Sequence, residues 1–230
     1  MNVHRPDEIR NGDSIPTDAT VTIIAGSRRA TEAVPAALYD VLDRAVDKPS
    51  FDARSLSADG VASVCAHLFD PSPRLEAVPI DGLVRLVGVA AGTAPFSPDA
   101  VVSGTADGVD AAGESFATSV ADLPVARFPA PWDDTDHPDA EVRDGRYGEY
   151  DARAGHRRNR WMAEYVAAHA DRGTLLAILA PDDDGQPTAG TADMIDLGRD
   201  ILGDDNVSVL PVGGVAVPDA LAPVLHPLAR

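Results

Sequence analysis

Short apolar runs alternate along this chain with segments in which apolar residues recur at helical spacing, and this alternation restricts the fold more than any other feature. Strands are predicted over Ala19–Ala25, Ala100–Val102, Pro124–Phe128, Thr174–Ala180 and Asn206–Val212. Helices are predicted over Glu32–Val46, Ala58–Phe69, Asp81–Ala91, a segment that ends near Val120, His156–Ala170 and Ala192–Leu202. Strands that alternate with helices predict an α/β domain, with a mostly parallel sheet and helices on both faces.

Three segments fall outside this alternation. Residues 1–19 are polar and predict a loose, flexible N-terminal arm, and residues 213–230 form an apolar, proline-rich tail that we expect to lie beyond the domain. Pro129–Gly155 shows no periodicity and contains Trp132 and two tyrosines. Loops of this length commonly carry function. We therefore expect Pro129–Gly155 to be a long loop that acts as a binding flap, with Trp132 at the ligand.

The charge balance limits the partners of the protein. The chain has 37 acidic and 19 basic residues, for a net charge of −18. Such a surface repels nucleic acid and anionic lipid at long range. An acid-rich chain with few lysines and aromatic residues is typical of halophilic proteins. Because the chain begins without a signal-peptide pattern and contains no apolar run near the ~18 residues of a membrane span, we expect a cytoplasmic protein with no membrane partner.

Two residue counts exclude whole classes of chemistry. Lys48 is the only lysine and no Gly-Lys pair exists, which excludes a Walker A phosphate loop and makes Schiff-base or pyridoxal chemistry implausible. Cys65 is the only cysteine, which excludes a disulfide framework and a cysteine-rich zinc site. The histidines His67, His137 and His156 are not spaced as metal ligands. We therefore expect neither a metal nor a cofactor.

Small-residue turns follow or precede the predicted elements at three places: Gly26-Ser27-Arg28, Ser103–Gly108 and Gly190-Thr191. In an open parallel sheet such turns meet at the carboxyl ends of the strands, where ligands bind. Glycine lets the backbone approach a ligand, and free amides at a helix N-terminus favour phosphate. Each turn alone is also explained by ordinary capping and turn formation. The three together favour a nucleotide site.

A cluster of arginines interrupts the acidic composition. Arg153–Arg160 contains four arginines and no carboxylate. Three of them fall near the start of a predicted helix, where positive charge opposes the helix dipole. They either hold an anionic ligand, since a guanidinium matches phosphate geometry, or pair with acids of the preceding loop. The acids considered are Asp144, Glu149 and Asp151. The sequence leaves both readings open.

The motifs GSR, VVSGTADGVD, FPAPWDD, YGEYDARAGHRRNRWMAEY and GTADMI occur in this order. The chain thereby resembles the DUF2493 branch of the SLOG superfamily, whose members run GSR, VVSGGARGVD, FPADW, YGKxAGxxRNxxMxxYAD and GTxxMI. The resemblance covers residues 20–35 and about 81–212. It implies a single Rossmann-like, three-layer, nucleotide-binding domain over residues 20–212, with residues 36–80 as an insertion. The superfamily includes the LOG phosphoribohydrolases and the DNA-processing protein DprA.

The resemblance also implies which residues form the ligand pocket. They come from the three turns and from the arginine-bearing helix. Carried over position by position, they are Gly26, Ser27, Arg28, Ser103, Gly104, Gly108, Asp110, Arg158, Asn159, Gly190 and Thr191.

Two departures from the related patterns bear on activity. Asp107 stands where the branch usually has an arginine, which removes one phosphate contact. Met194 stands where LOG enzymes carry their catalytic glutamate, and a thioether cannot act as a general acid or base. LOG-type hydrolysis would therefore need Asp110 or Asp193 as a substitute.

Three functions from different classes follow from these patterns. The first is a nucleotide-binding or nucleotide-sensing protein. The second is a nucleotide-processing hydrolase with Asp110 or Asp193 as acid or base. The third is a DprA-like role on single-stranded DNA, which the net charge of −18 disfavours. The sequence leaves a homo-oligomer open.

Overall fold

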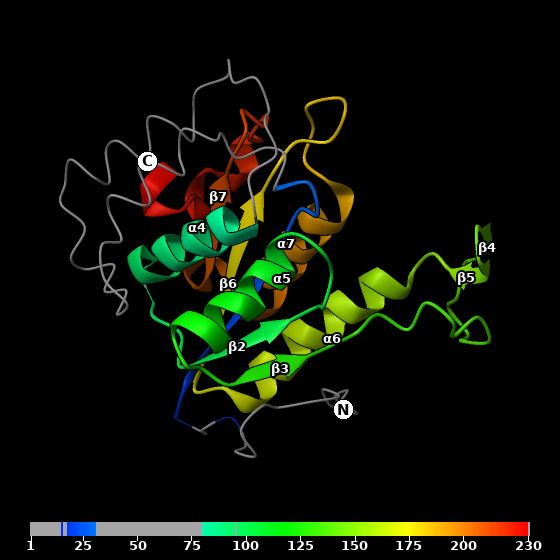
Figure 1. The fold of residues 1–230 in the computed structure, drawn as a ribbon, viewed down its shortest axis with the longest axis horizontal. Helices are drawn as coiled ribbons and strands as arrows, with labels where there is room; N and C mark the ends of the chain where they lie inside the picture. The colour runs from blue at the N-terminus through cyan, green and yellow to red at the C-terminus, as the bar shows by residue number, and fades with distance from the viewer. Residues whose placement is uncertain (1–14, 16–17, 31–79, 95, 230) are drawn as a thin grey trace.

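The computed structural model describes residues 15, 18–30, 80–94 and 96–229 (Figure 1). Several predictions lie outside these residues and stay predictions. They are the helices Glu32–Val46 and Ala58–Phe69, most of the loose N-terminal arm, nearly all of the 36–80 insertion, and the environments of Lys48, Cys65 and His67.

One parallel sheet forms the centre of the molecule. Its strands are β1 (Thr20–Gly26), β2 (Ala100–Ser103), β3 (Val125–Arg127), β6 (Arg172–Leu179) and β7 (Val207–Pro211), in the order β3-β2-β1-β6-β7. Every neighbouring pair is parallel. The observed strands match the predicted ones to within one or two residues at each end. The α/β prediction is therefore confirmed.

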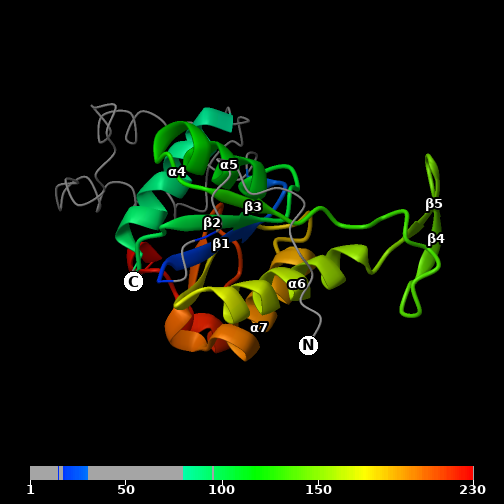
Figure 2. The same cartoon turned by 90° about the horizontal axis from the view of Figure 1, so that it is seen from below.

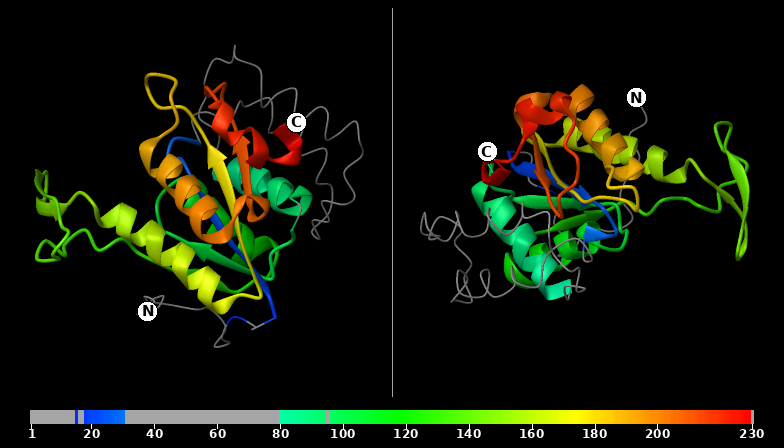
Figure 3. Two further views of the ribbon diagram at one scale, coloured as in Figure 1. Left: turned by 180° about the vertical axis from the view of Figure 1, so that it is seen from behind. Right: turned by 90° about the horizontal axis from the view of Figure 1, so that it is seen from above.

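Helices cover both faces of this sheet (Figure 2). Helices α4 (Ile80–Thr93) and α5 (Val109–Ser115), with the π-helical turn η2 (Phe116–Val120), lie on one face. Helices α6 (Ala154–His169) and α7 (Ala189–Leu202) lie on the other, as Figure 3 shows from behind. This three-layer arrangement is that of a single Rossmann-like domain.

The centre strand shows why two covered faces require a continuous apolar run. In β1 the adjacent residues Ile23 and Ile24 are both fully buried, yet they belong to different cores. Successive side chains of a strand point to opposite faces, so a strand covered on both faces cannot alternate apolar with polar residues. Thr22 and Thr174 form a buried polar pair in the sheet that is satisfied internally, because their hydroxyls lie 2.8 Å apart, within hydrogen-bonding distance.

The segment Pro129–Gly155 differs from the structureless loop expected. It contains an antiparallel hairpin of β4 (Val142–Gly145) and β5 (Gly148–Asp151), which projects from the body beyond the start of α6 (Figures 1 and 2). At its tip Tyr147 is 94% exposed. The hairpin escaped prediction because neither of its faces is buried against a core, so no alternation of apolar and polar residues marks its strands.

The base of this hairpin is held by one buried carboxylate. Asp151 accepts hydrogen bonds from the backbone amides of Glu141 (2.8 Å) and Arg153 (2.9 Å) and from the guanidinium of Arg157. Burial opposes ionisation of Asp151, but these donors outweigh it and lower the pKa of the carboxyl. The arm is therefore joined to α6 through polar contacts rather than through an apolar core.

The C-terminal tail packs on its own domain. It forms the 3-10 turns η4 (Asp219–Val224) and η5 (Pro227–Ala229) after the turn η3 (Asp204–Asn206) that precedes β7. Leu221 and Val224 are buried in the α6/α7 core. His226 is fully buried, and its Nε2 donates a hydrogen bond of 2.9 Å to the carbonyl of Ala90 on α4.

Among the described helices, none is long and apolar enough to cross a membrane.

Because His226 is buried, we expect a pH-dependent loss of stability. Burial lowers its pKa from 6.5 to about 4, although the hydrogen bond to Ala90 opposes the shift. Between these two values the unfolded chain binds a proton that the folded chain does not, so the free energy of unfolding falls as the pH falls. In urea titrations, the stability advantage of wild type over His226→Gln should shrink by roughly 3 kcal/mol between pH 7 and pH 4.

His169, which is exposed on α6, gives a matched control as His169→Gln. Its stability should follow wild type through the same pH range. An advantage of wild type over His226→Gln that does not change with pH would contradict the assignment.

Candidate functional site

The order of the strands places a crevice beside β1. The chain adds β2 and then β3 on one side of β1, crosses over through α6, and adds β6 and then β7 on the other side. At such a switch point the connections that leave two neighbouring strands diverge to opposite faces of the sheet. The crevice therefore lies at the carboxyl ends of β1 and β6.

The turn after β1 is tight against its neighbours. The amide of Ser27 donates to the carbonyl of Ile178 at the end of β6 (3.2 Å), and the hydroxyl of Ser27 accepts from the amide of Arg29 (3.1 Å). A Cβ on Gly26 would lie 2.4 Å from the Ile178 carbonyl oxygen, so glycine is required there. The predicted glycine is explained by packing between strands.

The turn after β2 uses its glycines to bring other parts of the site close. A Cβ on Gly104 would lie 1.7 Å from Nη1 of Arg158. A Cβ on Gly108, which has φ +79°, would lie 2.7 Å from Cα of Arg28. Ser103 lies behind this turn, where its hydroxyl donates to Glu114 and accepts from the amide of Thr105. These three predicted residues shape the site from outside the pocket.

A buried ion pair joins α5 to α6 across this edge of the sheet. Asp110 is only 3% exposed, and its Oδ2 lies 3.3 Å from Nη1 of Arg158. The same Oδ2 accepts from the amide of Ala106 at 3.3 Å, and Arg158 also donates to the carbonyl of Gly104. Burial raises the pKa of Asp110 to about 6, and the charge of Arg158 limits the rise.

Burial acts on the arginine as well. It lowers the pKa of Arg158, with Asp110 opposing the shift and the neighbouring charge of Arg28 adding to it. Arg158 and Arg28 are thus close enough to repel each other. An anion between them would relieve that repulsion.

The N-terminus of α7 forms the opposite wall. Its first amides have no acceptor inside the helix, and no side chain caps them, since the hydroxyl of Thr188 donates instead to that of Thr191 (2.9 Å). Gly190 and Thr191 lie within the first turn of α7, which begins at Ala189 rather than at Ala192 as expected. Asn159 is buried and donates to the carbonyl of Gly190 at 3.2 Å, which holds α6 against α7.

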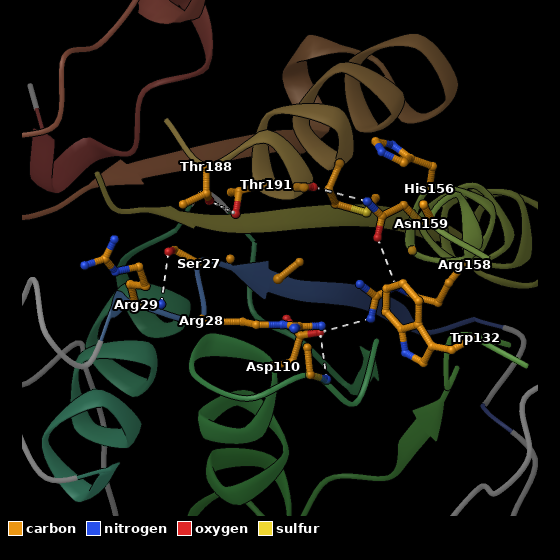
Figure 4. Close-up of a pocket in the computed structure, with 17 residues that line it drawn as sticks. Ser27, Arg28, Arg29, Asp110, Trp132, His156, Arg158, Asn159, Thr188 and Thr191 are labelled. Carbon is orange, nitrogen blue, oxygen red and sulfur yellow. Dashed lines mark hydrogen bonds and ion pairs between the residues drawn. The ribbon is translucent and has the colours of Figure 1, made fainter. Parts of the chain in front are cut away.

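These elements enclose a cavity of about 410 Å³ (Figure 4). It lies within the range of about 300–1,000 Å³ typical of small-molecule sites. Figure 4 shows the side chains of Arg28 and Arg158 pointing toward Asp110, with Trp132 beside Arg158. Trp132 is 41% exposed, and it is the aromatic residue that the Pro129–Gly155 segment contributes to the lining. No residue of β4, β5 or the hairpin tip belongs to the lining, so the expected flap does not cover the pocket.

Most of the residues predicted for the pocket line this one cavity. They are Gly26, Ser27, Arg28, Asp110, Trp132, Arg158, Asn159, Gly190 and Thr191. Asp193 lies just outside it and is bonded to Asn159 at 2.8 Å. Met194 lines the cavity, although its side chain is almost fully buried.

Sequence reasoning missed three polar residues of the lining: Arg29, His156 and Thr188. Arg29 and Thr188 are next to predicted residues in the chain, so a wider window around each turn would have included them. The sequence gives no sign of a role for His156, because its partner Asp193, whose Oδ1 lies 2.9 Å from its Nδ1, belongs to another helix. Among the described residues, no group of three or more histidine, cysteine or acidic side chains is placed to hold a metal ion.

The arginines of the cluster make ion pairs within the chain, and one of these is with Asp151, a loop acid that the sequence analysis considered. Arg157 pairs with Asp151 and Arg160 lies 3.9 Å from Glu164, so both meet carboxylates of the chain. Arg158 alone among the four points into the cavity.

Fold and site together describe a Rossmann-like α/β domain with a cationic pocket at its topological switch point. Comparison of the chain with known protein families, with curated proteins and with solved structures gives no match.

Removal of the cation next to Asp110 should destabilise the fold in a pH-dependent way. In Arg158→Met the pKa of Asp110 rises further, so the folded chain binds a proton that the unfolded chain releases, and stability falls as the pH rises through that window. We expect a loss on the order of 3–5 kcal/mol at pH 8. At pH 4.5 the loss should be smaller, because Asp110 is then neutral.

Denaturant titrations of Arg158→Met and of the exposed control Arg160→Met at both pH values test this. The double variant Asp110→Asn/Arg158→Met should lose the pH dependence. An equal loss for Arg158→Met at pH 4.5 and pH 8 would show that the pair does not govern the ionisation of Asp110.

Proposed function

We propose that this protein binds a nucleotide or nucleotide-derived ligand in the pocket at the switch point, as a binding or sensing protein. The observation that carries the proposal is the local reversal of charge. In a chain of net charge −18, the lining contains three arginines, Arg28, Arg29 and Arg158, against a single carboxylate, Asp110. An anion is the ligand that such a lining selects.

The phosphate of the ligand would lie between the β1 turn and the N-terminus of α7. Uncapped amides and the helix dipole of α7 favour an anion at Gly190. The guanidinium of Arg28 makes no hydrogen bond or ion pair with any described residue, so it is available to a ligand. Arg158 faces the same space from α6. Backbone amides and two arginines together match a phosphate group.

The base of the nucleotide would stack on Trp132. The ring is partly exposed within the lining, and a Cβ on Gly155 would lie 3.3 Å from its edge, so the ring rests against the start of α6. An indole face binds any base by stacking. Trp132 lines the pocket, so it is part of the site rather than of the projecting hairpin.

The resemblance to the DUF2493 branch of the SLOG superfamily supports a nucleotide as the ligand. It does not support LOG-type hydrolysis, because Met194 lines the cavity where those enzymes carry glutamate. Of the two substitutes considered, Asp110 lines the cavity and Asp193 does not. A DprA-like role on DNA finds no support in the charge of the chain. We further propose that the protein works in a cytoplasm of high salt.

A thermal-shift panel in high salt tests the binding proposal. AMP, ADP-ribose, NAD, other nucleoside monophosphates and cyclic nucleotides should include a ligand that raises the unfolding temperature of wild type. At 100 times its Kd, binding adds about 2.7 kcal/mol of stability. Each variant is compared with its own ligand-free form, and Arg158→Ala should show no ligand-induced shift. The control Arg160→Ala, on the same helix, should shift as wild type does. Equal shifts in both variants would contradict the proposed site.

The stacking role of Trp132 has a separate test. Trp132→Ala should weaken nucleotide binding by about 1–3 kcal/mol, the usual value of base stacking on an aromatic ring. Binding of inorganic phosphate should stay unchanged, because the phosphate contacts lie elsewhere in the lining. Isothermal titration calorimetry measures both. Tyr147→Ala, which removes the exposed ring at the hairpin tip, is the matched aromatic control. An equal loss for phosphate would mean that Trp132 supports the pocket without touching the base.

A further inference from the structure

A histidine and an aspartate meet at the rim of this pocket. His156 lies in the first turn of α6 and lines the cavity. Its Nδ1 is 2.9 Å from Oδ1 of Asp193, which lies in the second turn of α7. The two helices contact one another along their length, so this pair is brought together by tertiary packing. Neither residue is part of the binding role proposed above.

The aspartate of this pair is fixed in position. Its other oxygen, Oδ2, accepts from Nδ2 of Asn159 at 2.8 Å. Asn159 is buried, and its Oδ1 in turn accepts from Nε of Arg158 at 3.0 Å. A hydrogen-bonded row therefore runs from His156 through Asp193, Asn159 and Arg158 to Asp110. The imidazole is oriented by a carboxylate that cannot turn away.

This arrangement sets the chemistry of the ring. A carboxylate at Nδ1 requires a proton there, which leaves the lone pair on Nε2. Nε2 makes no hydrogen bond with any described residue, and the side chain of His156 is 53% exposed. A base at a pocket rim, oriented by a carboxylate and open to water, is equipped to take a proton from a water molecule.

We infer that His156 is a general base, with Asp193 as its positioning residue, for hydrolysis of a nucleoside phosphate held in the pocket. The inference rests on the proposed function, since it requires the phosphate to lie beside Arg158. Nε2 removes a proton from a water molecule as the water oxygen forms a bond to phosphorus. The bond from phosphorus to the leaving oxygen breaks, and that oxygen leaves with its electron pair and takes a proton from solvent.

The cations of the lining explain why attack at phosphorus is favoured. Arg28 and Arg158 neutralise charge on the phosphoryl oxygens, where it rearranges during transfer. Attack at a sugar carbon instead relies on carboxylates beside that carbon, and the one carboxylate in the described lining, Asp110, already pairs with Arg158. The geometry therefore favours phosphate ester or anhydride hydrolysis over glycosidic cleavage.

Other charges also face His156. The base of the hairpin contributes Glu141, Arg143 and Arg153 to a second hollow that His156 lines. Glu141 already pairs with both of these arginines. Asp193 is thus the acid within hydrogen-bonding distance of the ring among the described residues.

The test incubates the full chain, in high salt, with ATP, ADP-ribose and AMP in water enriched in oxygen-18. Products are resolved by mass spectrometry. Wild type should release phosphate or phosphomonoester that carries the label on phosphorus. His156→Ala should lose activity by about 10²–10⁴-fold, the usual contribution of a general base. Its thermal shift with AMP should persist. Imidazole added to His156→Ala should restore part of the rate, which a merely structural role would not allow.

Matched variants separate the two roles of the pair. His169→Ala, which removes an exposed histidine from the same helix, should retain full activity. In Asp193→Asn the acid limb of the pH–rate profile should move to lower pH, because the imidazolium loses its carboxylate. A profile that stays in place would overturn the positioning role of Asp193.

The outcomes distinguish this inference from the function on which it rests. If AMP stabilises wild type but none of the three compounds is hydrolysed, the inference fails and the binding proposal stands. Label found on the sugar rather than on phosphorus also overturns it. If no ligand of the panel binds and no compound is hydrolysed, both proposals fail.

Discussion

The central position of β1 is the constraint on which the rest of the site depends. This strand is hydrogen-bonded to β2 on one side and to β6 on the other, and both of its faces are covered. After its last residue the chain turns toward the α4/α5 face, where Ala30 is buried. The connection after β6 leads to α7 on the other face, where Met194 is buried. Because the two connections separate, a cavity opens between them, and α5, α6 and the segment with Trp132 complete its lining.

The pair of Asp110 and Arg158 spans this opening. Strand β2 ends at Ser103, and beyond it a side-chain contact connects the α5 layer to the α6 layer. The ion pair makes that connection, and Gly104 permits it because any Cβ there would overlap the guanidinium. Burying two charges costs much of what their attraction returns. The pair is thus a poor source of net stability but an effective way to fix a cation at the wall of the cavity.

The sequence predicted the elements whose buried residues form a regular pattern along the chain. The strands were located because both faces are covered, and the turn glycines because close approach or positive φ excludes other residues. The hairpin at Val142–Asp151 was not predicted, since its strands are largely exposed and show no such pattern of apolar residues. The pairing of His156 with Asp193 could also not be predicted from the sequence. It depends on how α6 packs against α7, and no spacing within either helix records it.

The arginine cluster shows how the same residue type acquires different roles within two turns of a helix. Arg157 and Arg160 pair with acids outside the cavity, whereas Arg158 pairs with Asp110 in the lining of the cavity. Only the geometry of α6 distinguishes them. If the proposal of a high-salt cytoplasm holds, the Debye length at molar salt is about 3 Å, so neither the net charge of −18 nor the local excess of arginine acts over longer distances. Selection of an anion under those conditions cannot rely on steering. It must come from direct contacts, which is why the orientation of Arg158 by Asp110, Gly104 and Asn159 matters more than the number of arginines nearby.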